Sequence, residues 1–387
     1  MSWPLVKLSE VAEINPRLPK NIDEAQEVTF LPMASISEQG QVLEQEKRIL
    51  GETRKGFTYF EKNDVVVAKI TPCFENGKAA YLDCLETQIG FGTTEFHVIR
   101  ADIEKLDGKY LFYLVWNKWF RHLGERNMSG SAGQKRVPSD FLKDLKIPLP
   151  PLDEQKRIAA ILDKADAIRR KRQQAIQLAD DFLRSVFLDM FGDPVTNPKG
   201  WEVKQVGKVV DCIVPGRDKP KSFTGGMPWI TTNDLNHLGS TYESEKSMGL
   251  SDQEIAAVKA RIIPKNSVLM TCVGDLGVIS IAGNDMVMNQ QLHAFLPNEN
   301  IEKEFLMYAL SFQKHYMIKM ASSTTVPYMN KTVCNSVPVI LPAIEMQKKF
   351  TVLFKKASLL RKRLISTQSS KRFLFNSLSQ KAFAGEL

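Results

Sequence analysis

Apolar residues recur at alternating steps of three and four between residues 149 and 193, which is the spacing of one face of a long α-helix. The positions are Ile158, Ile161, Ala165, Ile168, Ala175, Ala179, Phe182 and Val186, with Arg172 as a polar member. Pro150 and Pro151 precede this stretch and Gly192 follows it, so the helix is predicted to lie between them. Such a helix is on the order of 50 Å long. Because its apolar face needs cover, we expect a partner helix.

A second copy of this pattern closes the chain and supplies that partner. The segment Leu341–Lys348 repeats Leu149–Lys156 at a shift of 192 residues. The repeat predicts an antiparallel coiled coil of two helices, with an internal twofold repeat. Its expected seam consists of Ile158, Ile161, Ala165, Ile168 and Phe182 in the first helix and Phe350, Leu353, Ala357, Leu360 and Leu374 in the second.

The segment before the first helix, residues 1–148, has the pattern of a mixed α and β domain. Short apolar runs predict strands at Val28–Met33, Val65–Ile70, Ala79–Leu82 and Phe96–Ile99. Residues 109–123 are aromatic at helical spacing, which predicts a helix, with Tyr110 and Tyr113 facing the core. Two stretches of small residues, 90–94 and 128–136, predict loops.

The segment between the helices, residues 194–340, repeats this plan with lower identity. Trp201 corresponds to Trp3, and both are expected to tie the start of a domain to its core. His293 corresponds to His97, and both lie in apolar strands, which favours core histidines over functional ones. The loop 322–328 takes the place of the loop 129–138. The chain is therefore predicted to consist of domains at 1–148 and 194–340 and helices at 149–193 and 341–387.

Charge and composition narrow the class of protein. The chain has 387 residues and a formal net charge of +8. Residues 343–387 contain ten Lys or Arg and two Glu. The net charge of this last segment is therefore +8, the same as the net charge of the whole chain. A basic chain points to a polyanionic partner without identifying it. The five cysteines lack metal or disulfide spacing, and neither a membrane span nor a secretory signal is evident, so a cytoplasmic location is expected.

The sequence offers no pattern of an enzyme. Residues 51–56 have the glycine spacing of a phosphate loop but continue with Phe57 in place of Lys-Ser/Thr. Residues 90–95 lack the third glycine of a dinucleotide loop. The Asn-Pro-Pro-aromatic motif of amino-methyltransferases does not occur, and the acidic position before Lys69 that a nuclease would need is Val67. The five histidines have no metal spacing. We therefore expect no catalytic residue and no metal site in this chain.

Together these features resemble the specificity (S) subunit of Type I restriction–modification systems. The resemblance covers the whole chain, and its most specific motifs are Pro148–Ile158, the copy at Leu341–Phe350, Phe191–Pro194 and Phe383–Leu387. It implies an α+β fold in which two target-recognition domains are separated by two long helices packed as an antiparallel coiled coil. It also implies a non-catalytic subunit in which each domain reads one half of an interrupted double-stranded DNA target.

The resemblance further implies the partners. The helices are expected to dock two methyltransferase (M) subunits, and two restriction (R) subunits join the complex. Methyl transfer to adenine N6 would use S-adenosylmethionine in the M subunits, and ATP and Mg²⁺ would act in the R subunits. A scaffold whose repeated domains bind protein or RNA remains an alternative, as does a fused restriction–modification enzyme. The second is disfavoured because the repeat fills the chain.

A protein that reads duplex DNA needs contacts to the DNA backbone, which position the protein, and polar side chains that reach the edges of the bases. Residues of these types in loops give the DNA-contact candidates of the first domain: Lys69, Thr71, Asn76, Lys78, Thr93, Thr94, Ser129, Ser131, Gln134, Lys135 and Arg136. Those of the second domain are Thr231, Asn233, Thr271, Asn289, Gln290, Gln291, Thr324, Thr325, Tyr328, Asn330 and Lys331. The alternative is that these loops are ordinary surface. The two late loops, 129–136 and 322–331, are favoured because both precede a helix at equivalent positions.

Overall fold

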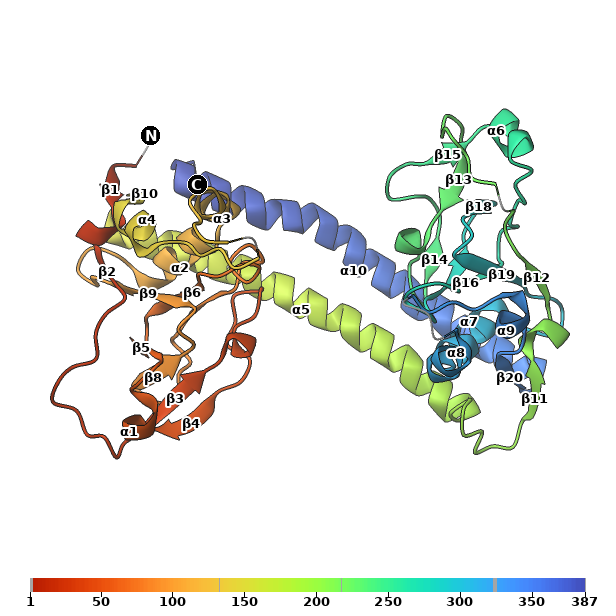
Figure 1. Ribbon diagram of the computed structural model, residues 1–387, viewed down its shortest axis with the longest axis horizontal. Helices are drawn as coiled ribbons and strands as arrows, with labels where there is room; N and C mark the ends of the chain where they lie inside the picture. The colour runs from red at the N-terminus through yellow and green to blue at the C-terminus, as the bar shows by residue number, and fades with distance from the viewer. Residues whose placement is uncertain (1–2, 132, 217, 323–325, 387) are drawn as a thin grey trace. The chain divides into compact units, whose positions relative to one another are not determined.

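The computed structural model describes residues 3–131, 133–216, 218–322 and 326–386, without the side chains of residues 365–376. The chain divides into two compact units, Met1–Arg172 with Gln368–Leu387, and Gln173–Thr367. Each unit contains one globular segment and a part of both long helices (Figure 1). The two units are therefore described one at a time.

The two predicted long helices are present. Helix α5 spans Leu152–Phe191 and begins directly after Pro150 and Pro151, which cannot continue into a helix. Helix α10 spans Ile344–Ala384 and follows Pro342 in the same way. The helices contain 40 and 41 residues, so the repeat in the sequence is also a repeat in length.

The first unit contains three sheets. Its strands are β1 (Leu5–Lys7), β2 (Ala12–Ile14), β3 (Glu27–Leu31), β4 (Glu46–Ile49), β5 (Thr58–Glu61), β6 (Val65–Ala68), β7 (Ala79–Tyr81), β8 (Ile89–Gly92), β9 (Phe96–Ala101) and β10 (Lys146–Pro148). The strand orders are β1-β10, β2-β9-β6-β7 and β4-β3-β8-β5. Its short helices are α1 (Leu50–Thr53), α2 (Gly108–Trp116), α3 (Lys118–Arg126) and α4 (Ser139–Asp144), with 3-10 turns η1 (Leu8–Glu10) and η2 (Met33–Ser35).

The second unit has the same kinds of elements in a similar chain order. Its strands are β11 (Glu202–Gln205), β12 (Asp211–Ile213), β13 (Met227–Ile230), β14 (Ser240–Thr241), β15 (Gly249–Leu250), β16 (Val268–Thr271), β17 (Ile279–Ala282), β18 (Val287–Met288), β19 (Leu292–Leu296) and β20 (Pro338–Leu341). The strand orders are β11-β20, β12-β19-β16-β17-β14 and β15-β13-β18. Its helices are α6 (Asp252–Ala257), α7 (Lys303–Ser311), α8 (Lys314–Met320) and α9 (Lys331–Asn335), with η3 (Val206–Lys208) and η4 (Thr232–Asp234).

Strand pairing shows that the two units share most of their topology, although the numbers of strands in two of the sheets differ. The first and last strands of each globular segment pair antiparallel, β1 with β10 and β11 with β20. Each unit also contains a corresponding parallel pair, β3 with β8 and β13 with β18. The buried central strands pair antiparallel, β6 with β9 and β16 with β19. The α+β fold with two similar units and two long helices is thus confirmed.

The ends of the long helices belong to the globular cores. In the first unit Ile158 and Leu162 of α5 and Ala382 of α10 are fully buried in the core that contains α2. In the second unit Phe187 and Phe350 are fully buried in the core that contains α7. In each unit, the start of one helix lies in the same core as the end of the other, so the two helices run antiparallel there.

The predicted seam is wrong at several positions. The side chains of Ile168, Phe182, Leu353 and Leu360 are 48%, 53%, 36% and 56% exposed. Ile158 and Phe350 are buried as predicted, and the other buried apolar positions of α5 are Ala159, Leu162, Leu183, Phe187 and Phe191. Ala165, Ile161 and Ala357 are partly buried, and the side chain of Leu374 lies outside the described residues. The reason is that the globular cores, and not only the partner helix, cover the apolar face, so its period is set by packing against a domain.

One buried glutamine fastens each long helix to its unit. Gln155 is fully buried, its Nε2 donates to the carbonyls of Lys105 and Pro150, and its Oε1 accepts from the amide of Asp107. The residue 192 positions later, Gln347, is equally buried. Its amide group accepts from the amide of Glu302 and donates to the carbonyl of Pro342. The repeat thus preserves a polar contact that joins each helix start to the loop before α2 or α7.

Replacing Gln155 with alanine is expected to lower the free energy of unfolding by about 2–4 kcal/mol, because it leaves buried backbone groups without partners. The measurement is urea unfolding of the full chain. The matched control is Gln177→Ala on the same helix, where the side chain is exposed. Equal effects of the two substitutions would contradict the role assigned to Gln155.

Two local predictions in the first unit need correction. Residues 90–92, expected in a loop, belong to strand β8, which pairs with β3. Gly90 is required there because a Cβ would lie 2.2 Å from the ring of Phe60. Residues 109–123, expected as one helix, form α2 and α3, because Asn117 adopts an extended conformation and caps α3 by accepting from the amide of Trp119.

Candidate nucleic-acid interface

Three loop segments of the first unit meet at the end of strand β6. The amide of Lys69 donates to the carbonyl of Glu95 at 2.9 Å, which joins the first segment to the loop before β9. The amide of Val137 donates to the carbonyl of Lys69 at 2.9 Å, and the amide of Thr71 donates to the carbonyl of Lys135 at 3.0 Å. The structure therefore brings together the segments 69–71, 93–95 and 129–137, which are far apart in the sequence.

The second unit forms the same arrangement at the end of strand β16. The amide of Cys272 donates to the carbonyl of Gln291 at 2.9 Å. The amide of Met329 donates to the carbonyl of Cys272 at 2.9 Å, and the amide of Gly274 donates to the carbonyl of Pro327 at 3.0 Å. These bonds correspond one by one to those of the first unit, so the fold repeats the loop scaffold as well as the core.

Most of the predicted contact residues lie on these two loop clusters. The residues gathered in the first unit are Lys69, Thr71, Thr93, Thr94, Ser129, Ser131, Gln134, Lys135 and Arg136. Those gathered in the second are Asn289, Gln290, Gln291, Tyr328, Asn330 and Lys331. Among them, Ser131, Gln134, Lys135, Gln291, Tyr328 and Lys331 are exposed. Exposed polar groups on a backbone-braced scaffold could contact a ligand without refolding.

The side chains on the shared scaffold differ between the units. In the first, Arg136 makes two hydrogen bonds to Glu95, Nε to Oε2 at 2.9 Å and Nη2 to Oε1 at 2.8 Å. The guanidinium lowers the pKa of the Glu95 carboxyl, so the pair is ionised. In the second unit Gln291 and Tyr328 occupy the corresponding backbone positions. Glu95 was missed by the sequence analysis because only the fold places it beside Arg136.

Several predicted contacts have structural roles. Thr271 is buried, and its hydroxyl donates to the carbonyl of Asp275 at 2.7 Å and accepts from the amide of Val278, so it holds a turn within the unit. Thr231 caps η4 through Asp234. Asn330 caps α9 by accepting from the amide of Val333 at 3.0 Å.

The remaining candidates lie beside the loop clusters. Asn76 is exposed and donates to Glu38 Oε1 at 2.8 Å, and Lys78 donates to the carbonyl of Met33 at 3.0 Å. Gln290 donates to the carbonyl of Gly216 at 3.0 Å. Asn233 is exposed in η4. Thr324 and Thr325 lie outside the described residues.

The aromatic and histidine predictions can be compared with the contacts. His97 is buried, its Nε2 lies 2.7 Å from the carbonyl of Val137, and burial lowers its pKa, so the ring is neutral. It braces the end of the late loop, and His293 is also buried, so both are core histidines as predicted. Tyr110, Tyr113 and Tyr308 are buried, which confirms their assignment to the core.

The two tryptophans tie each domain start to a helix end. Trp3 Nε1 donates to the carbonyl of Ala382 at 3.2 Å in α10, and Trp201 Nε1 donates to the carbonyl of Phe191 at 2.8 Å in α5.

In the described part of the chain, no group of three or more His, Cys, Asp or Glu side chains is placed to hold a metal ion. Among the same residues, no helix has the length and apolar character needed to cross a membrane.

The chain matches the family model of the Type I restriction modification DNA specificity domain twice, over residues 2–178 and 198–363. The chain therefore belongs to this family. It is 43% identical over 163 residues to the EcoEI specificity subunit of Escherichia coli, covering 42% of this chain and 27% of that protein. It is 45% identical over 157 residues to the EcoAI specificity subunit of the same organism, covering 40% and 26%. The chain thus spans about a quarter of the length of these relatives.

Solved structures share the fold over the whole chain. The Type I restriction–modification S subunit from M. genitalium aligns over 99% of this chain and 96% of its own, with a TM-score of 0.60 and 16% identity. A second chain, from a structure of the type I R-M system, covers 100% and 98% with a TM-score of 0.54 and 20% identity. At these identities the likeness concerns the fold alone.

Proposed function

We propose that this chain is the DNA-reading specificity subunit of a Type I restriction–modification complex and is itself non-catalytic. Each unit would contact one half of an interrupted duplex target through its loop cluster. The observation that carries the proposal is the pair of loop scaffolds with the same backbone hydrogen bonds and different side chains. A fixed scaffold with exchanged side chains is suited to reading two different half-sites.

The two long helices are proposed to set the gap between the half-sites and to dock two methyltransferase subunits, with two restriction subunits joining the complex. S-adenosylmethionine would then act in the methyltransferase subunits, and ATP and Mg²⁺ in the restriction subunits. The support is family membership and the repeated helices α5 and α10. Two such readers on one rigid spacer would need an interrupted target.

The first test is duplex binding by the full chain as a function of salt. Lys135→Gln in the first cluster and Lys331→Gln in the second are each expected to weaken binding and to reduce the slope of log affinity against log salt by about 0.9, the value for one phosphate contact. The control is Lys156→Gln, because Lys156 is exposed on α5 and outside both clusters. Binding that is insensitive to salt, or stronger for RNA than for duplex DNA, would overturn the proposal.

A further inference from the structure

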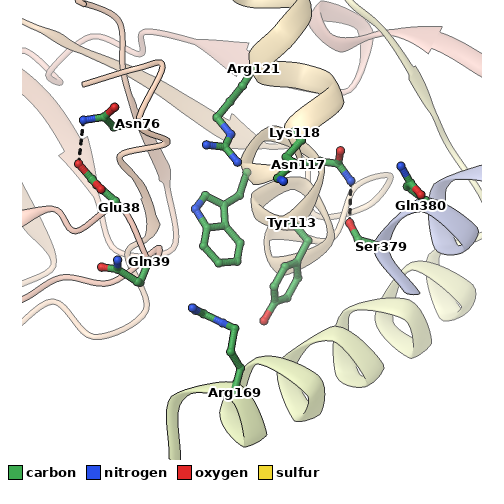
Figure 2. Close-up of a pocket in the computed structure, with 11 residues that line it drawn as sticks. Glu38, Gln39, Asn76, Tyr113, Asn117, Lys118, Arg121, Arg169, Ser379 and Gln380 are labelled. Atoms are coloured by element: carbon green, nitrogen blue, oxygen red, sulfur yellow. Dashed lines mark hydrogen bonds between the residues drawn. The ribbon is translucent and has the colours of Figure 1, made fainter. Parts of the chain in front are cut away.

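The first unit holds a cavity of about 260 Å³ whose lining includes Asn76, from the segment that follows Lys69 and Thr71. Three cationic side chains line it: Lys118 and Arg121 from α3, and Arg169 from α5. Figure 2 shows Arg121 and Arg169 directed into the space from opposite sides. Lys118 and Arg121 were not among the contact residues predicted from the sequence, because only the fold brings them to one cavity with Arg169.

Arg121 is a half-buried cation whose hydrogen bonds are incompletely paired. Its Nε is buried without a hydrogen-bond partner, and its Nη1 lies 3.4 Å from the carbonyl of Glu75, a long contact. Burial lowers the pKa of Arg121, which reflects the loss of solvation of the charge. A desolvated guanidinium of this kind is stabilised by an anion that accepts its hydrogen bonds.

Two other charged groups at the cavity, Arg169 and Glu38, are held by neighbours. Arg169 pairs with the buried carboxylate of Asp166 at 2.6 Å, and its guanidinium carbon lies 5.5 Å from the ring centre of Trp116. Asp166 also pairs with Arg170 at 2.5 Å, so two guanidinium groups share one carboxylate. Glu38, the acidic residue in the lining, accepts from Asn76 at 2.8 Å. The hydrogen bond from Asn76 leaves Glu38 charged, but the three cations of the lining outnumber this one carboxylate, so the lining keeps a net positive charge.

Comparison with the repeat shows why the cavity exists in the first unit. There, Asn117 Nδ2 donates to Ser379 Oγ at 2.7 Å in the cavity wall. In the second unit, Phe312 corresponds to Asn117 and lies 195 positions after it. Phe187 corresponds to Ser379 and lies 192 positions before it. Their rings stack with centres 5.4 Å apart. A small polar pair thus replaces two phenyl rings, so the cavity is not required by the repeated fold.

We propose that this cavity binds a phosphate group and that, in the DNA-bound protein, the group is a backbone phosphate beside the half-site contacted by the first unit. The second part of the proposal rests on the proposed function. Two of the three cationic side chains, those of Lys118 and Arg121, come from α3, a nine-residue helix whose start lines the cavity. Asn76 links the cavity to the loop that follows the contact residues Lys69 and Thr71.

The phosphate group is tested first on the full chain with inorganic phosphate. Its melting temperature is measured in sodium phosphate and in sodium chloride of equal ionic strength. Phosphate is expected to raise the melting temperature of the unmodified chain and of Lys143→Gln, a control in which the residue is exposed on α4. Arg121→Gln is expected to lose affinity for phosphate by about tenfold or more, because a hydrogen-bonded charged partner is removed.

Lys118→Gln provides a second variant, because Lys118 lies in the first turn of α3 and its side chain is not part of the hydrophobic core. It is expected to weaken phosphate binding as well. Equal melting temperatures of the unmodified chain in phosphate and chloride would overturn the phosphate site. An unchanged response in Arg121→Gln and Lys118→Gln would overturn its assignment to this cavity.

The source of the phosphate is tested with duplex DNA of mixed sequence. If the cavity takes a backbone phosphate, Arg121→Gln reduces the slope of log affinity against log salt by about 0.9, while Lys143→Gln leaves it unchanged. Phosphate binding with an unchanged slope would overturn the DNA assignment in favour of a free phosphate. If the unmodified chain does not bind duplex DNA, the proposed function fails, whereas the melting experiment still decides the phosphate site.

Discussion

Replacing Phe187 with alanine is expected to lower the free energy of unfolding of the second unit by about 3–5 kcal/mol. Phe187 is fully buried near the end of α5, and its ring centre lies 4.9 Å from that of Phe191 and 5.3 Å from that of Phe350. It also stacks on Phe305 and Phe312. Removing this ring would leave a cavity among side chains from three helices, which packed cores cannot readily close.

The measurement is urea unfolding of the full chain, with amide hydrogen exchange in α7 to locate the loss in the second unit. The control is Leu178→Ala on the same helix, where the side chain is 60% exposed. This control is expected to have an effect of less than about 1 kcal/mol. A loss for Phe187→Ala no larger than that of the control would mean that the end of α5 does not belong to the core.

Deleting one heptad from each long helix is expected to shorten the gap between the half-sites by about three base pairs, since seven residues correspond to about 10 Å of helix. The equivalent segments under the 192-residue repeat are 171–177 in α5 and 363–369 in α10. Removing seven residues rotates the remainder of each helix about its axis by only about 20°. The apolar face of each helix would therefore stay nearly in register while the spacer changes.

The matched control removes five residues from each helix, which rotates the remainder of the helix by about 140° and should abolish recognition of a single duplex face. The measurement is the methylated motif in cells that carry the variant and its methyltransferase partner. Unaltered spacing after the seven-residue deletion would refute the proposal that the helices set the gap, even if the bases read were unchanged.

The elements that could be predicted well from the sequence are those set by local pattern. The buried strand Val65–Ala68 is a run of apolar residues, and the start of α5 is fixed by Pro150 and Pro151. Both can be recognised without knowing which segments pack against them. The same holds for the repeat, because a shift of 192 residues aligns Gln155 with Gln347 and both make the same kind of contact.

The features that could not be predicted from the sequence depend on packing between distant segments. Phe182 fits the heptad pattern, yet it is exposed while Leu183 is buried, because the domain core selects the covered face. Thr271 resembles a loop residue but turns inward to hold the turn before Val278. The cavity beside Arg121 depends on small polar residues in two distant segments, which become meaningful only when α3 and α10 are placed together.

The most direct test of the central proposal is a methylation map. The chain is co-expressed with the methyltransferase subunit proposed as its partner in a host that lacks DNA methylation, and N6-methyladenine is located along the genome by long-read sequencing. The account predicts one split motif with two different halves and a fixed gap. A short continuous motif, or no methylation by a complex that assembles, would contradict reading by two separate units.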